Sequence, residues 1–171
     1  MKKLMIAAAI VCAAAYAQAA SISWGLYGNG VDQAGNIITE APANMTFILA
    51  MSNGAGGWTQ VGDAGTWDIG EDSGESWANV GGKATAGDIA DWQGKTFSIK
   101  VIVDGKIQDV QLAEGGVYAT TLTVPDDATG SYVNSKTLTS TADFIAQVPE
   151  PTSGLLLLLG VAGLALKRKR A

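Results

Sequence analysis

The chain has 171 residues, of which 47% are hydrophobic and 16% are charged, and its formal net charge is −5. This length fits one domain of ordinary size. The chain has no histidine and one cysteine, Cys12, so disulfide frameworks, zinc sites of His or Cys, and Ser/His or Cys/His nucleophile pairs are excluded. These absences argue against most hydrolase chemistry, and we assign no catalytic residue, no metal ligand and no cofactor.

The first 19 residues have the pattern of a secretory signal peptide. Lys2 and Lys3 precede an apolar run of 14 residues, and Ala17 and Ala19 have the small-x-small spacing that signal peptidase requires before Ala20. An uncleaved membrane anchor is the alternative. The run would make a helix of about 21 Å, whereas the hydrocarbon core of a bilayer is about 30 Å thick, so we expect cleavage after Ala19.

The other end of the chain has the pattern of a short membrane helix. Residues 153–166 are almost entirely apolar on every side, and four cations follow at once: Lys167, Arg168, Lys169 and Arg170. A buried core helix would not normally end in such a cluster, whereas a membrane helix holds its cytoplasmic end with one. Positive charge at both chain ends predicts that both stay cytoplasmic and that the body between them is translocated.

The residues just before this apolar segment form a distinct motif. Pro149 and Pro151 fix their own φ angles and disfavour helix in the preceding residues, so Glu150 is held in an extended conformation that a protease can bind. The motif Pro149-Glu150-Pro151, the apolar segment and the basic end together resemble the PEP-CTERM sorting signal. The resemblance covers residues 148–171.

The resemblance implies a processing route for this protein. In that family a multi-pass membrane enzyme, the exosortase, recognises the signal and cleaves near it, and the members are exported proteins of Gram-negative bacteria that make extracellular polysaccharide. We therefore expect signal peptidase and exosortase as processing partners, transient anchoring in the inner membrane with the domain on the periplasmic side, and a final location at the cell surface or in the extracellular matrix.

The body of the chain, residues 20–147, is strongly acidic. From residue 20 to residue 150 there are five lysines, no arginine and all sixteen acidic residues, which leaves a net charge of −11. Binding to nucleic acid depends on Lys and Arg displacing counterions from phosphates. We therefore expect no nucleic-acid partner.

Alternating apolar residues and turn signals predict that this body is an all-β, jelly-roll-like β-sandwich. The clearest element is a hairpin, because Asp104-Gly105 is typical of a type I′ turn and lies between two alternating segments. Between Asn53 and Gly87 we expect long loops with short strands, and one helical turn at Asp88–Trp92. The expected strands are residues 21–27, 45–51, 96–103, 106–112, 116–124 and 132–139.

Three tryptophans, Trp58, Trp67 and Trp77, are spaced along the glycine-rich region. We favour packing at the edge of the sandwich, because large aromatic side chains dominate core energetics. The functional alternative is a sugar-stacking face, in which an exposed indole contacts the apolar face of a pyranose.

The same region carries a cluster of acidic residues. Its spacing lacks the ligand pattern and the sixth-position glycine of an EF-hand, so a solvated acidic loop is the preferred interpretation over a calcium site. A glycosidase needs only two carboxylates at a fixed separation, and nothing in the sequence selects such a pair. The cluster consists of Asp63, Asp68, Glu71, Asp72 and Glu75.

These observations predict an exported surface or matrix protein, structural or adhesive and without enzymatic activity. Two alternatives stay open, a carbohydrate-binding module for extracellular polysaccharide and a secreted glycosidase that uses a carboxylate pair.

Overall fold

The computed structural model describes residues 19–146, which form eleven β-strands, one short α-helix and one turn of 3-10 helix. The elements in chain order are β1 (Ala20–Leu26), β2 (Gly30–Val31), β3 (Met45–Ser52), β4 (Trp58–Val61), β5 (Thr66–Asp72), β6 (Glu75–Ala86), η1 (Ile89–Asp91), β7 (Thr96–Val103), β8 (Lys106–Asp109), β9 (Thr121–Thr123), α2 (Gly130–Asn134), β10 (Thr137–Ser140) and β11 (Phe144–Ile145).

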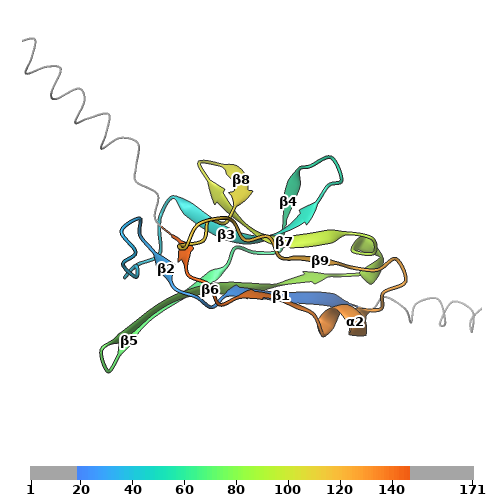
Figure 1. Ribbon diagram of the computed structural model, residues 1–171. Coiled ribbons are helices and arrows are strands. Elements are labelled where there is room, and N and C mark those ends of the chain that lie inside the picture. Colours follow the sequence, from blue (N-terminus) through green and yellow to red (C-terminus); the bar gives the residue numbers. More distant parts are fainter. Residues whose placement is uncertain (1–18, 147–171) are drawn as a thin grey trace, which may run out of the picture.

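The strands form two larger sheets, which lie as two layers in Figure 1, and one small sheet. The four-stranded sheet has the order β10-β1-β6-β5, and the five-stranded sheet has the order β4-β3-β7-β8 with β9 also paired to β7. The prediction of an all-β domain is confirmed. The pairs β1–β10 and β2–β11 are parallel, so the pairing departs from the antiparallel jelly roll that we expected. The predicted signal and membrane helices lie outside the described residues.

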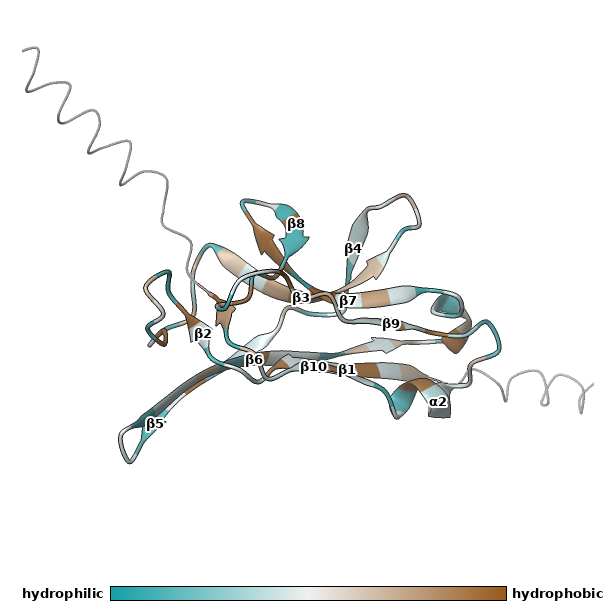
Figure 2. Cartoon of the chain, in the orientation of Figure 1, coloured by the Kyte–Doolittle hydropathy of each residue, from teal (hydrophilic) through white to brown (hydrophobic). Residues whose placement is uncertain are grey.

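The core lies between the two layers and follows from strand alternation. Ile22, Trp24 and Leu26 of β1 are at most 2% exposed, because successive side chains of a strand point to opposite faces. Figure 2 shows hydrophobic residues along the facing strands of both layers. Phe47 of β3 meets Trp67 of β5 edge-on across the layers, with ring centroids 5.4 Å apart. Each large side chain buried in this way stabilises the fold by about 1.5–3 kcal/mol.

The predicted hairpin at Asp104-Gly105 is confirmed. Both residues have positive φ, 51° and 74°, as a type I′ turn requires, and Val103 pairs with Lys106. The second strand of this hairpin ends at Asp109, three residues earlier than we predicted.

The expectation of long loops between Asn53 and Gly87 is wrong. The segment forms β4, β5 and the twelve-residue β6, which is the longest strand among the described residues. A second tight turn at Ser73-Gly74, with φ values of 54° and 87°, joins β5 to β6. Because β6 has β5 on one side and β1 on the other, pairing and packing outweigh its low intrinsic strand propensity.

Two further predicted strands are shorter than expected. The strand predicted at 116–124 is reduced to β9, and the first three residues of the segment 132–139 belong to α2. The reason for the helix is a cap that alternation does not reveal, since the side chain of Thr129 accepts a hydrogen bond from the Tyr132 amide. The helical turn after Asp88 is confirmed, and the Asp88 carboxylate caps it.

Candidate functional site

The outward face of the four-stranded sheet gathers exposed aromatic and polar side chains. We call it the outer platform, and it consists of Ser23, Tyr27, Thr66, Asp68, Trp77 and Asn79. Register places these residues on one face. Asp68 pairs with Asn79, and on either side of this pair Thr66 lies opposite Gly81 and Trp77 lies opposite Gly70. Alternation therefore sends them away from the core that Trp24 and Val80 fill.

Two aromatic rings of the platform lie on glycines. A Cβ atom on Gly25 would stand 2.9 Å from the Tyr27 ring, and one on Gly70 would stand 2.4 Å from the Trp77 ring. Each ring thus covers backbone that has no side chain of its own, an arrangement that stabilises glycine within a strand. The rings are held in place, yet Tyr27 is 60% exposed and Trp77 is half-buried.

Hydrogen bonds fix the polar groups between the rings. The Trp77 indole Nε1 donates to Asp68 Oδ1 at 3.3 Å, and the Asn79 amide nitrogen donates to the carbonyls of Tyr27 and Gly28 at 3.2 and 3.0 Å. The carboxylate of Asp68 keeps further acceptor positions, and the hydroxyl of Thr66 lies one row away. Ordered aromatic faces next to hydroxyl, amide and carboxylate groups are suited to a ligand that has both apolar faces and many hydroxyls.

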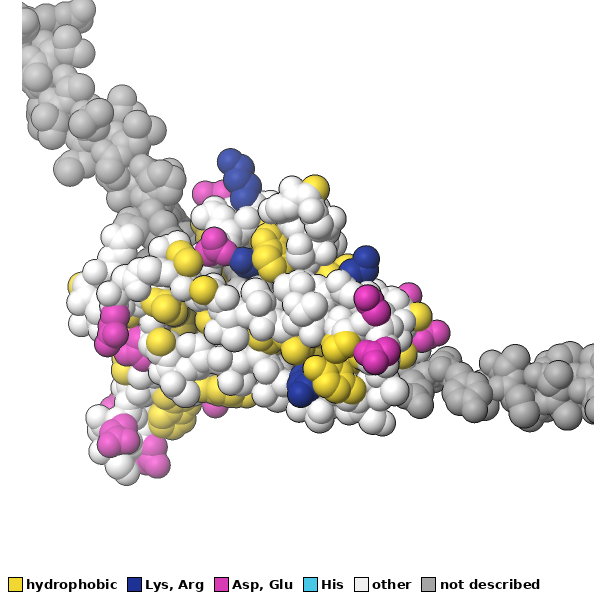
Figure 3. Space-filling model, turned by 45° about the vertical axis from the view of Figure 1, so that its right-hand side comes forward, with side chains coloured by type: hydrophobic (Ala, Val, Ile, Leu, Met, Phe, Trp, Pro, Cys, Tyr) yellow, Lys and Arg dark blue, Asp and Glu magenta, His cyan; other side chains and the backbone are white. Residues whose placement is uncertain are grey.

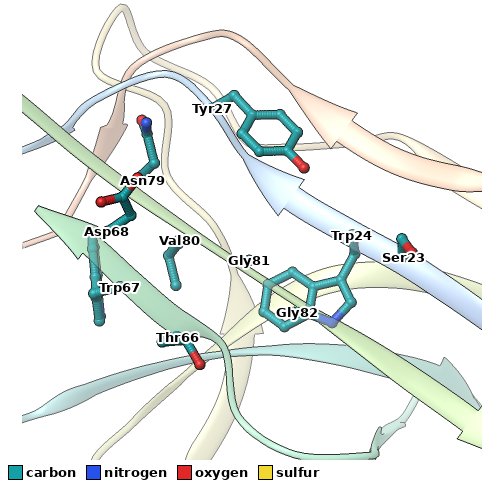
Figure 4. Close-up of a pocket in the computed structure, with 10 residues that line it drawn as sticks. All are labelled: Ser23, Trp24, Tyr27, Thr66, Trp67, Asp68, Asn79, Val80, Gly81 and Gly82. Atoms are coloured by element: carbon teal, nitrogen blue, oxygen red, sulfur yellow. The ribbon is translucent and has the colours of Figure 1, made fainter.

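An open concavity of about 460 Å³ lies on this part of the sheet. Figure 4 shows Asn79 and Asp68 beside each other and the Tyr27 ring across from them. Gly81 and Gly82 contribute no side chains to its lining, and Trp24 also lines it. The Trp24 Nε1 is buried without a hydrogen-bond partner, next to Gly82. Such orphan donors are rare in folded proteins.

The charge of this face is negative toward the end of the β5–β6 ribbon. Asp72 and Glu75 pair directly across the ribbon, and Figure 3 shows carboxylates gathered at the end of this protrusion. One lysine, Lys83, lies on the same face, opposite Ser23. This face of the described sheet therefore carries three carboxylates, those of Asp68, Asp72 and Glu75, and one ammonium group, that of Lys83.

The three tryptophans singled out from the sequence do not share one surface. Trp67 packs with Phe47 and Phe144 in the core, and its ring stacks on that of Phe144 at 5.9 Å. Trp58 lies on β4 in the five-stranded sheet, where the Lys100 ammonium stands 4.1 Å from its ring centroid. Of the three, Trp77 belongs to the outer platform but does not line the concavity, whereas Trp67 lines it from the other face of β5.

The five clustered acidic residues do not converge on one point. Asp68, Asp72 and Glu75 face outward, Glu71 lies on the other face of β5, and Asp63 precedes β5. Within residues 19–146 no group of three or more His, Cys, Asp or Glu side chains is arranged to hold a metal ion.

Sequence reasoning missed Ser23, Tyr27, Thr66 and Asn79 as site residues. A signal for Tyr27 existed, because it is the outward aromatic of the predicted strand 21–27 and follows Gly25 by two positions. Thr66 and Asn79 gave no signal of their own, since only the pairing of β5 with β6 brings them beside Asp68.

The structure describes part of the predicted signal-peptidase site. Ala20 is the first residue of β1 and is 1% exposed, whereas Ala19 is exposed and its carbonyl accepts a hydrogen bond from Asn134 Nδ2 at 3.4 Å. Ala17, the Pro149-Glu150-Pro151 motif, the segment 153–166 and the basic end lie outside the described residues. In the part of the chain that is described, no helix is long and apolar enough to cross a membrane.

Comparison with known proteins adds one match. A search of curated proteins gave none, and neither did a search of solved structures. A family model, the PEP-CTERM protein-sorting motif, matches residues 147–170, directly after Ala146, the buried residue that follows β11. The chain is therefore a protein with a PEP-CTERM sorting signal, which implies export, sorting by an exosortase and a surface or extracellular location.

Proposed function

We propose that the domain is a non-catalytic adhesive module that holds extracellular polysaccharide on its outer platform. The observation that carries this proposal is the pair of aromatic rings, Tyr27 and Trp77, each of which lies over a glycine on the outward face of the sheet. A sugar ring has an apolar face for such aromatic contacts and hydroxyls for the polar groups between them.

Rigidity supports binding at this face. Tyr27 is held on Gly25, and Trp77 is fixed by Gly70 and by its hydrogen bond to Asp68. Side chains that are already ordered lose little conformational entropy when a ligand arrives. The site therefore needs no rearrangement to present its aromatic faces.

The sorting signal gives this binding a biological setting. A protein delivered to the cell surface or to the extracellular space meets polysaccharide at high local concentration. An adhesive module needs no catalytic group, which agrees with the lack of histidine in the chain. The membrane segment at residues 153–166 would hold the protein in the inner membrane until an exosortase processes it.

Adsorption of the purified protein to isolated extracellular polysaccharide tests the proposal. Wild-type protein should sediment with the polysaccharide, and its tryptophan emission should change on binding. Replacing Tyr27 and Trp77 with alanine together should abolish adsorption. Tyr132→Ala is the matched control, since this tyrosine is 37% exposed on α2 and is not one of the platform residues, and its loss should leave adsorption unchanged.

A second measurement separates adhesion from hydrolysis. Incubation with the same polysaccharide should release no reducing ends. Release that is abolished by one carboxylate substitution would identify a glycosidase and overturn the non-catalytic part of the proposal. Equal adsorption of the wild type and the double variant would overturn the platform as the binding site.

A further inference from the structure

We infer that the outer platform takes an uncharged polysaccharide chain, which crosses the sheet diagonally and contacts Tyr27 and Trp77 at two separate points. This inference rests on the proposed polysaccharide binding and specifies its substrate class. It follows from the spacing of the two rings and from the charges around them.

The register of the strands gives the spacing. The Tyr27 ring lies over Gly25 on β1, and Gly25 shares a row with Gly81 and Thr66. The Trp77 ring lies over Gly70, two strands away and four residues further along β5. With about 4.8 Å between strands and about 3.4 Å per residue, the two rings are about 17 Å apart. One sugar unit cannot reach both rings, whereas an extended oligosaccharide can.

The groups between the rings suit a chain of hydroxyl-bearing units. Asp68 and Asn79 form the row next to Gly81, and the concavity lies along Thr66, Asn79 and Gly81. At Gly81 the carbonyl oxygen of Trp24 stands 2.7 Å from where a Cβ atom would lie, so backbone rather than a side chain lines the concavity there. The Asp68 carboxylate and the Asn79 amide oxygen can accept hydrogen bonds from hydroxyls of the chain, because the Asn79 amide nitrogen already donates to two backbone carbonyls.

Charge selects against acidic polymers. On this face of the described sheet Asp68, Asp72 and Glu75 stand against one lysine, Lys83, and residues 20–150 as a whole have a net charge of −11. A polymer of uronic acids would meet like charge at Asp68 between the two rings and at Asp72 and Glu75 beyond Trp77, and the repulsion would act at short range in physiological salt. An uncharged glucan or galactan meets no such barrier.

Titration of the full-length protein in detergent against oligosaccharides of increasing length tests the two-point contact. For an uncharged β-glucan series, the association constant should rise steeply from disaccharide to hexasaccharide. Tyr27→Ala and Trp77→Ala should each lower hexasaccharide binding by about tenfold, the size expected for losing one aromatic contact. Trp58→Ala, a tryptophan of the other sheet, is the control and should leave the constant unchanged. Binding of a disaccharide as tight as that of the hexasaccharide would overturn the two-point contact.

Comparison of three soluble polymers tests the charge class. Hydroxyethylcellulose should bind and be insensitive to salt, whereas polygalacturonate should bind at least about tenfold more weakly at low salt. Glu75→Gln should strengthen the binding of polygalacturonate and leave the binding of hydroxyethylcellulose unchanged, so the difference in affinity between the two polymers should become smaller. Tighter binding of polygalacturonate, or of chitosan in a salt-sensitive manner, would overturn the inference and leave the proposed adhesion standing. Failure of every polymer to bind, with adsorption to isolated extracellular polysaccharide retained, would overturn the inference alone, and loss of both would overturn the proposed function as well.

Discussion

Gly28 is the position at which the structure predicts the largest effect of adding one methyl group. It follows Tyr27 and lies against the segment that leads into β11. A Cβ atom on Gly28 would stand 2.1 Å from the carbonyl oxygen of Ala142 and 2.7 Å from the Asp143 amide nitrogen. Both are backbone atoms, so no rotamer change can relieve the contact. Gly28→Ala must therefore separate two segments of backbone.

The loss of stability can be estimated from the hydrogen bonds that this separation weakens. The Asn29 amide donates to Asp143 Oδ1 at 2.6 Å, and the Phe144 amide donates to the Asn29 carbonyl at 3.0 Å. Overpacking of a closed site costs about 1–3 kcal/mol, and each weakened hydrogen bond adds about 1 kcal/mol. We expect Gly28→Ala to lower the free energy of unfolding by about 3 kcal/mol and the melting temperature by about 10 °C.

Urea unfolding of the purified protein, followed by tryptophan fluorescence, measures this loss. Gly87→Ala is the matched control, because a Cβ atom there meets nothing within 4 Å and the residue does not have positive φ. The control should be neutral or stabilising by up to about 1 kcal/mol. A loss at Gly28 below about 1 kcal/mol, or one equal to that of the control, would refute the close approach of the two segments.

Three further predictions concern other parts of the domain. Gly105→Ala should lower the free energy of unfolding in urea by about 1–2 kcal/mol, because φ is +74° at this residue. A Cβ atom there would meet nothing within 4 Å, so the backbone conformation alone sets the loss. An unchanged urea midpoint would contradict the type I′ turn. Asp109→Asn should lower the free energy of unfolding by about 1–2 kcal/mol more than Lys100→Met does, because it leaves the ammonium group of Lys100, a residue 6% exposed, without its carboxylate partner. A larger loss for Lys100→Met would contradict this reasoning. Hydrogen bonds from the Asn36 side chain and then from its backbone amide lower the pKa of Asp32 below 3.8, so the stability they add is present above that pH and is lost as pH falls through the lower folded value. Asn36→Ala should raise this pKa in an NMR titration, and an unmoved titration curve would contradict the cause given.

Strand alternation predicted the interior face of β1 and the turn of the β7–β8 hairpin. Ile22, Trp24 and Leu26 alternate with small or polar residues, and Asp104-Gly105 is a turn signal that few other structures accommodate. Both are local, so the sequence suffices for them. The processing motifs at the two ends are local too, because their charge, length and apolar character do not depend on folding.

The outer platform needs contacts between distant segments. Tyr27 and Trp77 are fifty residues apart, and their common face arises from the pairing of β1 with β6. The glycine-rich composition of β5 and β6 predicted loops, since glycine has low intrinsic strand propensity. The rings of Trp77 and Trp24, which lie against Gly70 and Gly82, supply the packing that these glycines themselves lack.

The sequence by itself determined the all-β class, the acidic body and the sorting signal, because alternation, composition and a terminal motif are properties of neighbouring residues. Tertiary structure alone decided which tryptophans are core and which are surface. Trp67 and Trp77 have similar surroundings in the sequence, yet the pairing of β5 with β6 turns one toward Phe47 and the other toward solvent. A shift of one residue in that register would exchange the two faces, and only long-range packing fixes the register.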